Sequence, residues 1–522
     1  MKQPDIIFIV LDTQRADRLS CYGYDKPTSP NLDKFAAAGA LFSQGIAPAQ
    51  WTIPSHASMF TGLYPSTHQV TQSNQALGHD RPHLTELLGQ MGYETVGFCN
   101  NPLVGILNNG FKRGFDTFYN YGGAIPTVPS DSSRLPGWLG KLSARYTQFL
   151  RRISYPIQNY FGQSDLAFRI ATNAWLTPLW SKYINFKGQN ERSVRDLCNF
   201  LDAREKEPAD EPLFLFVNLM ETHLPFWPPR EHIAQFAPYL LEDKKAQATL
   251  NAWNREAYRW AAPLAEPLSE LESRIINDLY DAEVHYQDSY LGQLFAALER
   301  RGNRENTLTV IVGDHGDGFG EHGYFGHAFV AYQELLHVPL LLHWPAQIKP
   351  GQHEDPVSTR RVYHTMLAAA GPLPENIKHL TPAEVRKLSL RESLAGREAE
   401  KEGAYAEVYP PLNFVKTIQH RQPELLEQFR CLSVRRALVQ GQEKLISIDN
   451  RPEELYNLQT DYPESTNLAP DAIARVASLN NQLDRLATLA ELQRETISSG
   501  AALDLEADEG LLQHLRGLGY ID

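Results

Sequence analysis

The segment of the sequence best equipped for chemistry is Gly313–Gly323, in which five glycines are mixed with acids and histidines. It begins with Gly313-Asp314-His315 and follows a short apolar run. Glycine lets the backbone turn sharply and approach a ligand closely. Carboxylate and imidazole groups suit a hard or borderline divalent cation, and the spacing does not match an EF-hand calcium loop. We therefore predict a metal site at Asp314 and His315.

A second candidate segment, Trp51–Gly62, is typical of the start of a helix. Thr52 suits the N-cap, Pro54 suits the first turn, and Gly62 can end the helix. The first turn of a helix offers unpaired N–H groups and the positive end of the dipole, where an anion binds. Thr52 and His56, four residues apart, would share one face. These local signals also fit an ordinary capped helix.

These segments need a scaffold that brings them together, and the hydrophobic pattern predicts one. Four short apolar runs are typical of parallel strands buried on both faces, namely Ile6–Leu11, Thr95–Cys99, Leu213–Leu219 and Thr307–Val312. Helical patterns occur between and around them, at Asn31–Ala38, Pro82–Met91, Ser193–Glu205 and Leu268–Arg300. Alternation of this kind predicts a layered α/β fold.

Side chains that can bind a metal or an anion follow three of these four strands. Asp12 comes directly after the first strand, His223 follows the third, and Asp314 and His315 follow the fourth. Sites in open α/β sheets gather beyond the carboxyl ends of the strands, so we expect these side chains to lie close together.

The bulk properties exclude several classes of protein. A formal net charge of −13 argues against nucleic acid as the main partner. No stretch approaches the length of a membrane span, and the first apolar run stops at Asp12, too early for a signal peptide. We therefore expect a cytoplasmic protein. The four cysteines show no short paired spacing, which predicts neither a disulfide framework nor a zinc knuckle. Nothing in the sequence indicates the oligomeric state.

At 522 residues the chain exceeds what one hydrophobic core usually organises. We predict a catalytic domain over residues 1–372 and a smaller α+β domain over residues 373–522. The smaller domain would have a helical tail and strands at Ala404–Tyr409, Phe429–Val439 and Lys444–Ile448. Residues 122–187, rich in Tyr, Trp, Phe and Arg, form a predicted aromatic helical insertion. A lid over the site, a dimer surface and extra packed helices all fit this composition.

Taken in order, the motifs resemble those of the sulfatase family within the alkaline-phosphatase superfamily, over nearly the whole chain. The similar segments are Asp12–Asp17, Cys21–Tyr24, Thr28–Asp33, Pro54–Pro65, Thr222–Phe226, Asp314–Gly323, Leu336–Leu340 and Glu454–Leu458. Each segment alone is only modestly specific for this family, whereas the occurrence of all of them in the same order is highly specific for it. The resemblance implies an alkaline-phosphatase-like three-layer sandwich of α/β class, with a mainly parallel central sheet and a smaller C-terminal α+β domain.

Two departures from the family pattern bear on the chemistry. Sulfatases carry Cys-x-Pro-Ser-Arg, less often with Ser first, and the first residue is oxidised to formylglycine. Here Thr52 stands in place of the cysteine and His56 in place of the arginine. Threonine, a secondary alcohol, cannot yield that aldehyde. The resemblance then implies one divalent cation per chain (Mn²⁺, Zn²⁺, Ca²⁺ or Mg²⁺) bound by Asp12, Thr52, Asp314 and His315.

We predict a metal-dependent hydrolase or transferase of phosphate-type esters (phosphomonoesters, phosphodiesters or phosphonates) or sulfate esters, with Thr52 as the nucleophile. The ester would be a small molecule, a glycan or a lipid. His56 and His223 would add hydrogen bonds or positive charge in the transition state. His327, near where relatives place a lysine, would protonate the leaving oxygen. Asp317 would orient a metal ligand.

Two alternatives remain open at the level of sequence. One is a sulfuric ester hydrolase in which metal-bound water, rather than Thr52, attacks the ester. The other is a non-catalytic sulfatase-fold protein that binds sulfated or phosphorylated ligands, which the loss of the cysteine and the arginine would explain.

Overall fold

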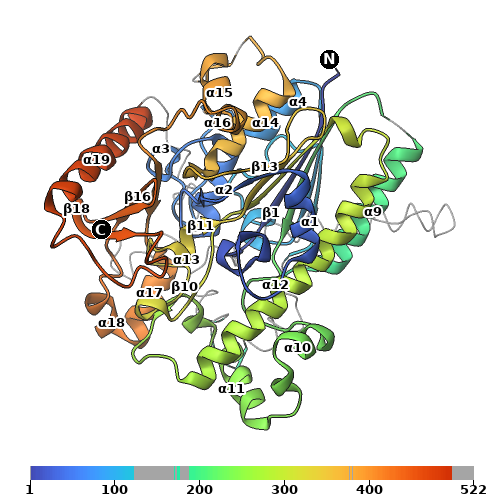
Figure 1. Cartoon of the computed structure of the whole chain (residues 1–522). Coiled ribbons are helices and arrows are strands. Elements are labelled where there is room, and N and C mark those ends of the chain that lie inside the picture. The colour runs from blue at the N-terminus through green and yellow to red at the C-terminus, as the bar shows by residue number, and fades with distance from the viewer. Residues whose placement is uncertain are drawn as a thin grey trace, which may run out of the picture.

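The computed structural model describes residues 2–495 except 81, 123–169, 171, 172, 174, 177–186, 208, 376 and 379. Its centre is an eight-stranded sheet with the strand order β13-β2-β12-β8-β1-β6-β4-β5, covered by helices on both faces (Figure 1). The predicted insertion at 122–187 lies almost wholly outside the described residues, as does the chain after residue 495. Among the described residues, no helix is both long and apolar enough to cross a membrane.

The four strands predicted from apolar runs form the middle of this sheet. They are β1 (Asp5–Leu11), β4 (Glu94–Cys99), β6 (Leu213–Leu219) and β8 (Thr307–Gly313). Neighbours among them pair in parallel, β4 with β6, β6 with β1 and β1 with β8. The sheet is therefore mainly parallel, as expected for strands that are apolar along their whole length.

Four further strands of the sheet were not predicted from the sequence. They are β2 (Ala40–Phe42), β5 (Thr117–Asn120), β12 (Leu340–His343) and β13 (Gly351–His353). β12 runs antiparallel to both of its neighbours. These strands have only three or four residues, which is too short for a pattern of hydrophobicity to identify.

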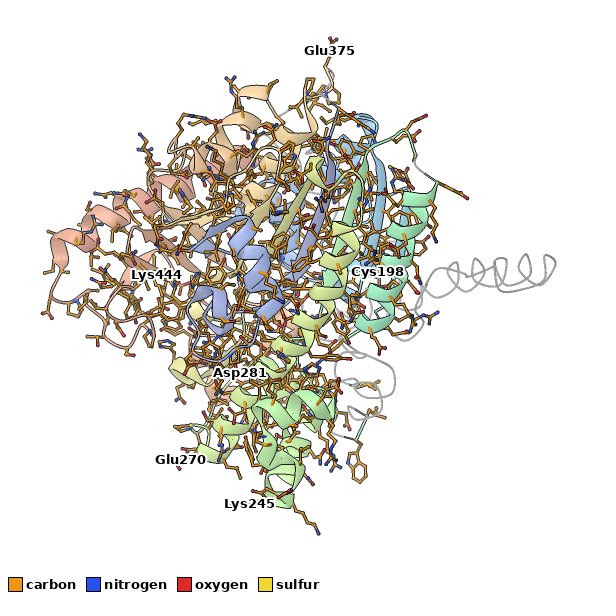
Figure 2. All side chains as sticks on the ribbon, turned by 45° about the vertical axis from the view of Figure 1, so that its right-hand side comes forward. Cys198, Lys245, Glu270, Asp281, Glu375 and Lys444 are labelled. Carbon is orange, nitrogen blue, oxygen red and sulfur yellow. The ribbon has the colours of Figure 1, made fainter. Side chains whose placement is uncertain are left out.

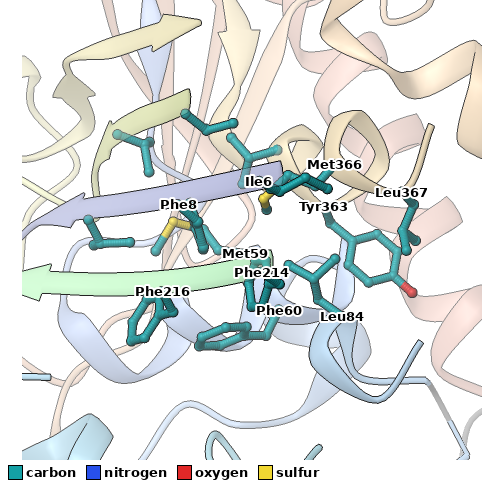
Figure 3. Packing of buried hydrophobic residues seen from close by; sticks show 14 of the residues in the cluster. Ile6, Phe8, Met59, Phe60, Leu84, Phe214, Phe216, Tyr363, Met366 and Leu367 are labelled. Atoms are coloured by element: carbon teal, nitrogen blue, oxygen red, sulfur yellow. The ribbon is translucent and has the colours of Figure 1, made fainter. Parts of the chain in front are cut away.

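Alternate side chains of β1 divide the interior into two cores. Ile6, Phe8 and Val10 pack with α2 (Thr52–Thr61), α4 (Leu84–Gln90) and α14 (Val362–Ala370). Ile7, Ile9 and Leu11 pack with α1 (Pro30–Ala38), α9 (Asn190–Lys206) and α12 (Glu270–Glu299). Figure 3 shows the first core, where Phe60 of α2 lies near Phe8 and Phe216. The result is the three-layer α/β sandwich that was expected.

A second, antiparallel sheet follows near the C-terminus, with the order β15-β16-β17-β18. Its strands are β15 (Ala404–Val408), β16 (Arg435–Gln440), β17 (Glu443–Ile448) and β18 (Arg451–Asn457). One face packs on α19 (Ile473–Glu495), where Leu438 and Leu445 contact Leu479 and Leu483. Lys444 of β17 lies in this part of the molecule, whereas Asp281 lies on α12 (Figure 2).

One predicted strand in this region starts later than expected. The sequence predicted a strand over Phe429–Val439, but β16 begins only at Arg435. The residues before it continue the turn that ends α18 (Pro423–Gln428), where the Phe429 N–H donates to the Leu425 carbonyl over 3.0 Å. Arg430 then adopts a positive φ of 49°, which ends the helical turn.

Candidate active site and metal centre

The ends of two neighbouring strands bring the predicted metal ligands together. Leu11 of β1 is paired with Gly313 of β8, so the residues that follow both strands lie at the same edge of the sheet. One ligand atom from each of Asp12, Asp314 and His315 lies within 4.8 Å of the others. All three residues are fully buried. The site predicted from strand ends therefore exists as a compact cluster.

The two carboxylates of this cluster lie close together in a fully buried setting. Asp12 Oδ1 and Asp314 Oδ2 accept no hydrogen bond of ordinary geometry from the described residues, and no lysine or arginine among these residues pairs with either group. Burial raises the pKa of Asp12 to about 6. Burial and the charge of Asp12 raise the pKa of Asp314 well above its ordinary value. Two carboxylates and an imidazole are a donor set that fits a divalent cation.

Hydrogen bonds hold His315 in the tautomer that a metal ligand requires. The His315 Nδ1–H donates to the Gly316 carbonyl over 2.8 Å, which leaves Nε2 as the unprotonated nitrogen. This Nε2 lies 3.3 Å from Thr52 Oγ1 and 3.5 Å from Asp314 Oδ2. Asp314 is fixed through its other oxygen, which accepts from the backbone N–H groups of His315 and Thr13.

Thr52 is the first residue of α2, and the prediction that it caps the helix is wrong. Trp51 is the N-cap, and no side chain accepts a hydrogen bond in the capping position. The Thr52 hydroxyl lies instead 3.3 Å from His315 Nε2. Gly62 ends the helix with a φ of +72°, as the sequence indicated.

His56 lies one turn further along α2, surrounded by the rings of Phe60, Phe111 and Phe216. Its Nδ1–H donates to the Thr52 carbonyl over 3.0 Å, and its Nδ1 lies 3.4 Å from Asp314 Oδ2. Burial lowers the pKa of His56 to about 4. The side chain is therefore neutral at neutral pH, and its single N–H is donated to the Thr52 carbonyl, so it does not supply the positive charge of the family's arginine.

His223 and His327 lie at the edge of the cluster. The centroid of the His327 ring is 4.6 Å from that of His315 and 5.2 Å from that of His223. His223 Nδ1 is 2.6 Å from the Leu224 carbonyl, and burial lowers the pKa of His223 to about 3. The structure thus brings every predicted site residue to one edge of the sheet.

Asp317 has a different partner from the one expected. The sequence suggested that it orients a metal ligand, but its Oδ1 lies 3.0 Å from His327 Nδ1. Asp317 is fully buried, and its charge also acts on Asp12 of the cluster. Burial raises the pKa of Asp317, and the charge of His327 opposes this rise.

Sequence reasoning missed Asn101, which contacts two members of the site. Its Nδ2 donates to Asp12 Oδ2 over 2.5 Å and lies 3.5 Å from Thr52 Oγ1. Its Oδ1 accepts from the Leu103 N–H at the start of α5 (Pro102–Gly105), which fixes the orientation of the amide. A signal was available, because Asn100 and Asn101 directly follow the second predicted strand. This was the one strand end left without a candidate.

Comparisons with known proteins find one matching family model and several similar proteins. Residues 4–372 match the family model described as Sulfatase. The chain is 25% identical over 376 residues to the uncharacterized sulfatase YidJ of Escherichia coli, covering 71% of this chain and 68% of that protein. Its fold is similar to that of the phosphonate monoester hydrolase of Agrobacterium radiobacter, with 20% identity, a TM-score of 0.61 and coverage of 94% and 96% of the two chains.

A second similar structure is BT4656 in complex with its substrate D-glucosamine-2-N,6-O-disulfate, with 18% identity, a TM-score of 0.62 and coverage of 95% of this chain and 99% of that one. The family model extends over more than half of the chain and includes every residue of the cluster. The protein is therefore a member of the sulfatase family, with the α/β fold of the alkaline-phosphatase superfamily.

Proposed function

We propose that this protein is a metal-dependent ester hydrolase or transferase in which Thr52 is the nucleophile and the ester is of the phosphate type. The observation that supports it best is the position of Thr52 Oγ1, which lies 3.3 Å from His315 Nε2 and next to two buried carboxylates. No lysine or arginine in the described part of the chain pairs with either carboxylate. A hydroxyl so placed has no structural role as a helix cap. Nucleophilic hydroxyls need such a setting, because an isolated alcohol is too weakly acidic to attack.

Asp12, Asp314 and His315 would hold one divalent cation, with the Thr52 oxygen as a fourth ligand. Such a cation lowers the pKa of a hydroxyl and screens the negative charge of a bound ester. The ion is Mn²⁺, Zn²⁺, Ca²⁺ or Mg²⁺. Asn101, held by the Leu103 N–H, fixes Asp12 through its amide and keeps the threonine oxygen close to the carboxylate.

Thr52, His223 and His327 would act directly on the ester. The Thr52 hydroxyl would lose its proton to solvent, its oxygen would attack phosphorus in line, and the bond to the leaving oxygen would break as the new bond forms. His223 donates its Nδ1–H to the Leu224 carbonyl, so its Nε2 donates a hydrogen bond to a non-bridging oxygen once a proton enters the site with the ester. His327, held by the Asp317 carboxylate, delivers a proton to the leaving oxygen. Water or an acceptor alcohol then releases the group from Thr52.

A phosphate-type ester is favoured over a sulfate ester for a chemical reason. The sulfatases named in the comparisons belong to a family that uses formylglycine, and Thr52 cannot be converted to it. One fold neighbour is a phosphonate monoester hydrolase, which shows that this fold supports phosphorus chemistry. A sulfuric ester hydrolase that uses activated water in place of Thr52 is the second candidate, because the named relatives are mostly sulfatases. A protein that only binds such ligands is the third.

A panel of aryl phosphate monoesters, phosphodiesters, phosphonates and sulfates, assayed with and without a chelator, tests these candidates. We expect chelator-sensitive cleavage of a phosphorus ester and one divalent ion per chain by elemental analysis. Asp314→Asn should abolish turnover, and Thr52→Ala should lower it by at least about 1,000-fold, the scale seen when a nucleophile is removed. Turnover that survives in Thr52→Ala would favour the water mechanism, and no turnover with any of the four ions would favour the binding protein.

A further inference from the structure

Thr13, which follows the proposed metal ligand Asp12, has a backbone conformation that threonine rarely adopts. Its φ is +53°, in the left-handed region. A side chain branched at Cβ is strained there, because its Cβ crowds the following carbonyl oxygen. Strained conformations of this kind persist only where the surrounding structure holds them. Thr13 must therefore be held by its neighbours, and its hydrogen bonds identify them.

The left-handed conformation of Thr13 directs its backbone N–H to the metal centre. This N–H donates to Asp314 Oδ1 over 3.2 Å, and the His315 N–H donates to the same oxygen over 2.8 Å. With Oδ1 held by two donors, Asp314 Oδ2 is left for the proposed cation. A Thr13 backbone that rotated out of the left-handed region would withdraw one of the two donors. The orientation of Asp314 therefore depends on the conformation of Thr13.

Tyr280 of α12 fixes the carbonyl group of Thr13. Its hydroxyl donates to the Thr13 carbonyl over 2.7 Å and accepts from the Arg15 N–H over 2.9 Å. The side chain is fully buried, and its ring centroid lies 4.7 Å from that of Phe319. Burial raises the pKa of Tyr280, so the hydroxyl keeps its proton and remains a donor. One hydroxyl group therefore bridges two backbone groups of the turn after β1.

A second side chain of α12 holds the next residue of this turn. Gln287 lies seven residues after Tyr280, on the same face of the helix, and donates to Gln14 Oε1 over 3.1 Å. Gln14 Nε2 in turn donates to the Arg15 carbonyl over 3.0 Å. The turn is thus held from α12 at two points, and Tyr280 is the point at which Thr13 is held.

We propose that Tyr280 is a positioning residue for the metal centre: its hydroxyl keeps Thr13 in the left-handed conformation, in which the Thr13 N–H fixes Asp314. The inference rests on the proposed function, because the cation is the one that Asp12, Asp314 and His315 would hold. It means that a single hydroxyl group, on a helix that carries none of these ligands, sets how tightly the cation binds.

Titration of chelator-treated protein with Mn²⁺, followed by calorimetry, measures this effect without any ester. Tyr280→Phe, which keeps the ring, should weaken Mn²⁺ binding at least about 10-fold, the lower end of the range for groups that orient metal ligands. The absorption spectrum of the Co²⁺-loaded protein should change too, because it reports the geometry of the ligands. Tyr93→Phe is the matched control. The buried Tyr93 hydroxyl donates to the Pro4 carbonyl over 2.9 Å at the other end of β1, so both readouts should stay unchanged.

Thr13→Gly tests the role of strain, because glycine adopts the left-handed conformation without crowding. In that background Tyr280→Phe should weaken Mn²⁺ binding by less than about 3-fold, since the two changes act on one contact. If Tyr280→Phe alone does not fold, the double variant should fold and bind Mn²⁺.

Four results would overturn this role of Tyr280. They are Mn²⁺ affinity and Co²⁺ spectra that Tyr280→Phe leaves unchanged, an equal loss of affinity in Tyr93→Phe, an equal effect of Tyr280→Phe with threonine and with glycine at position 13, and a double variant that does not fold. The expected changes in metal binding, in a protein that turns over no ester, would instead contradict the proposed function and leave the role of Tyr280 standing. A natural sequence that binds neither ion would contradict both.

Discussion

At the scale of single residues, Asn101 contacts both the proposed nucleophile, Thr52, and the proposed metal ligand Asp12. Its amide donates to Asp12 and reaches Thr52, while its own carbonyl oxygen is fixed by the Leu103 N–H. Side chains that hold metal ligands usually change activity by 10- to 100-fold when they are removed. The amide of Asn101 should therefore contribute to catalysis without contacting the reacting phosphorus.

We expect Asn101→Ser to lower kcat/KM by about 10- to 100-fold, because serine keeps an acceptor for the Leu103 N–H but removes the donor to Asp12. The measurement is steady-state kinetics on the best aryl ester, together with metal content. Asn100→Ser is the control, since Asn100 donates to the Asn218 carbonyl and does not contact the cluster. Equal activities of the two variants would contradict this role.

The lowered pKa of His56 predicts how the stability of the metal-free protein depends on pH. Its pKa in the folded state is about 4, below the ordinary value of 6.5, because the ring is buried among phenylalanines. The unfolded state therefore binds a proton more tightly than the folded state. Stability that is fully present above pH 6.5 is lost as the pH falls toward 4, by about 2 kcal/mol at pH 5.

His56→Gln, which keeps a side-chain donor, should remove this part of the acid sensitivity. The free energy of unfolding, measured in urea with chelator present, should fall less between pH 7.5 and pH 5 in the variant than in the natural sequence. Other buried histidines titrate in both proteins, so the difference between the two isolates His56. An identical pH dependence would show that His56 is not held neutral by burial.

At the scale of elements, the position of α2 decides where the nucleophile lies. The helix begins at Thr52 and must end at Gly62, where the chain turns with a φ of +72°. A Cβ at Gly62 would come within 2.6 Å of the His364 ring and 2.7 Å of the Tyr363 ring of α14. Both the left-handed conformation and the packing against α14 therefore require glycine.

Gly62→Ala should destabilise the protein by at least about 2 kcal/mol, because backbone strain and overpacking act together. Gly441→Ala is a matched control: Gly441 also has a positive φ, of 59°, but nothing lies within 4 Å of its added Cβ. The control should cost only about 1 kcal/mol. Thermal unfolding of both variants tests this, and equal shifts in Tm would show that packing against α14 is not limiting.

At the scale of the whole molecule, a buried ion pair of the C-terminal part contacts Gln333, which lies in the segment that leads into the core. Lys444 of the antiparallel sheet lies 2.8 Å from Glu464, and both side chains are fully buried. Lys444 also donates to the side chain of Gln333, whose backbone N–H donates to Glu464. Gln333 begins α13 (Gln333–Leu336), which leads into β11 (His337–Val338) and β12 of the core. The C-terminal sheet thus supports the segment behind the metal site.

Lys444→Met should cost about 3–5 kcal/mol, because Glu464 would keep a buried charge without a partner. The double variant Lys444→Met/Glu464→Gln should recover most of that loss, since glutamine is neutral and still accepts from Gln333. Denaturant unfolding of the two single variants and the double variant gives the coupling energy. Purely additive effects would mean that the pair contributes little to the junction of the sheets.

Much of this protein follows from local sequence. Apolar runs of five to seven residues identified β1, β4, β6 and β8, because strands buried on both faces must be apolar throughout. The rule that sites lie beyond the carboxyl ends of strands then selected Asp12, Asp314 and His315. Gly62 marked the end of α2 because only glycine adopts its conformation without strain.

Other features were decided only by the tertiary structure. The strands β2, β5, β12 and β13 are too short to have a hydrophobic pattern of their own and exist because neighbouring strands offer hydrogen bonds. The contacts of Asn101, the neutral state of His56 and the partner of Asp317 were also decided only by the tertiary structure. Each depends on contacts between residues far apart in the chain. Sequence sets which side chains are available, whereas burial and distance decide which are charged and which touch.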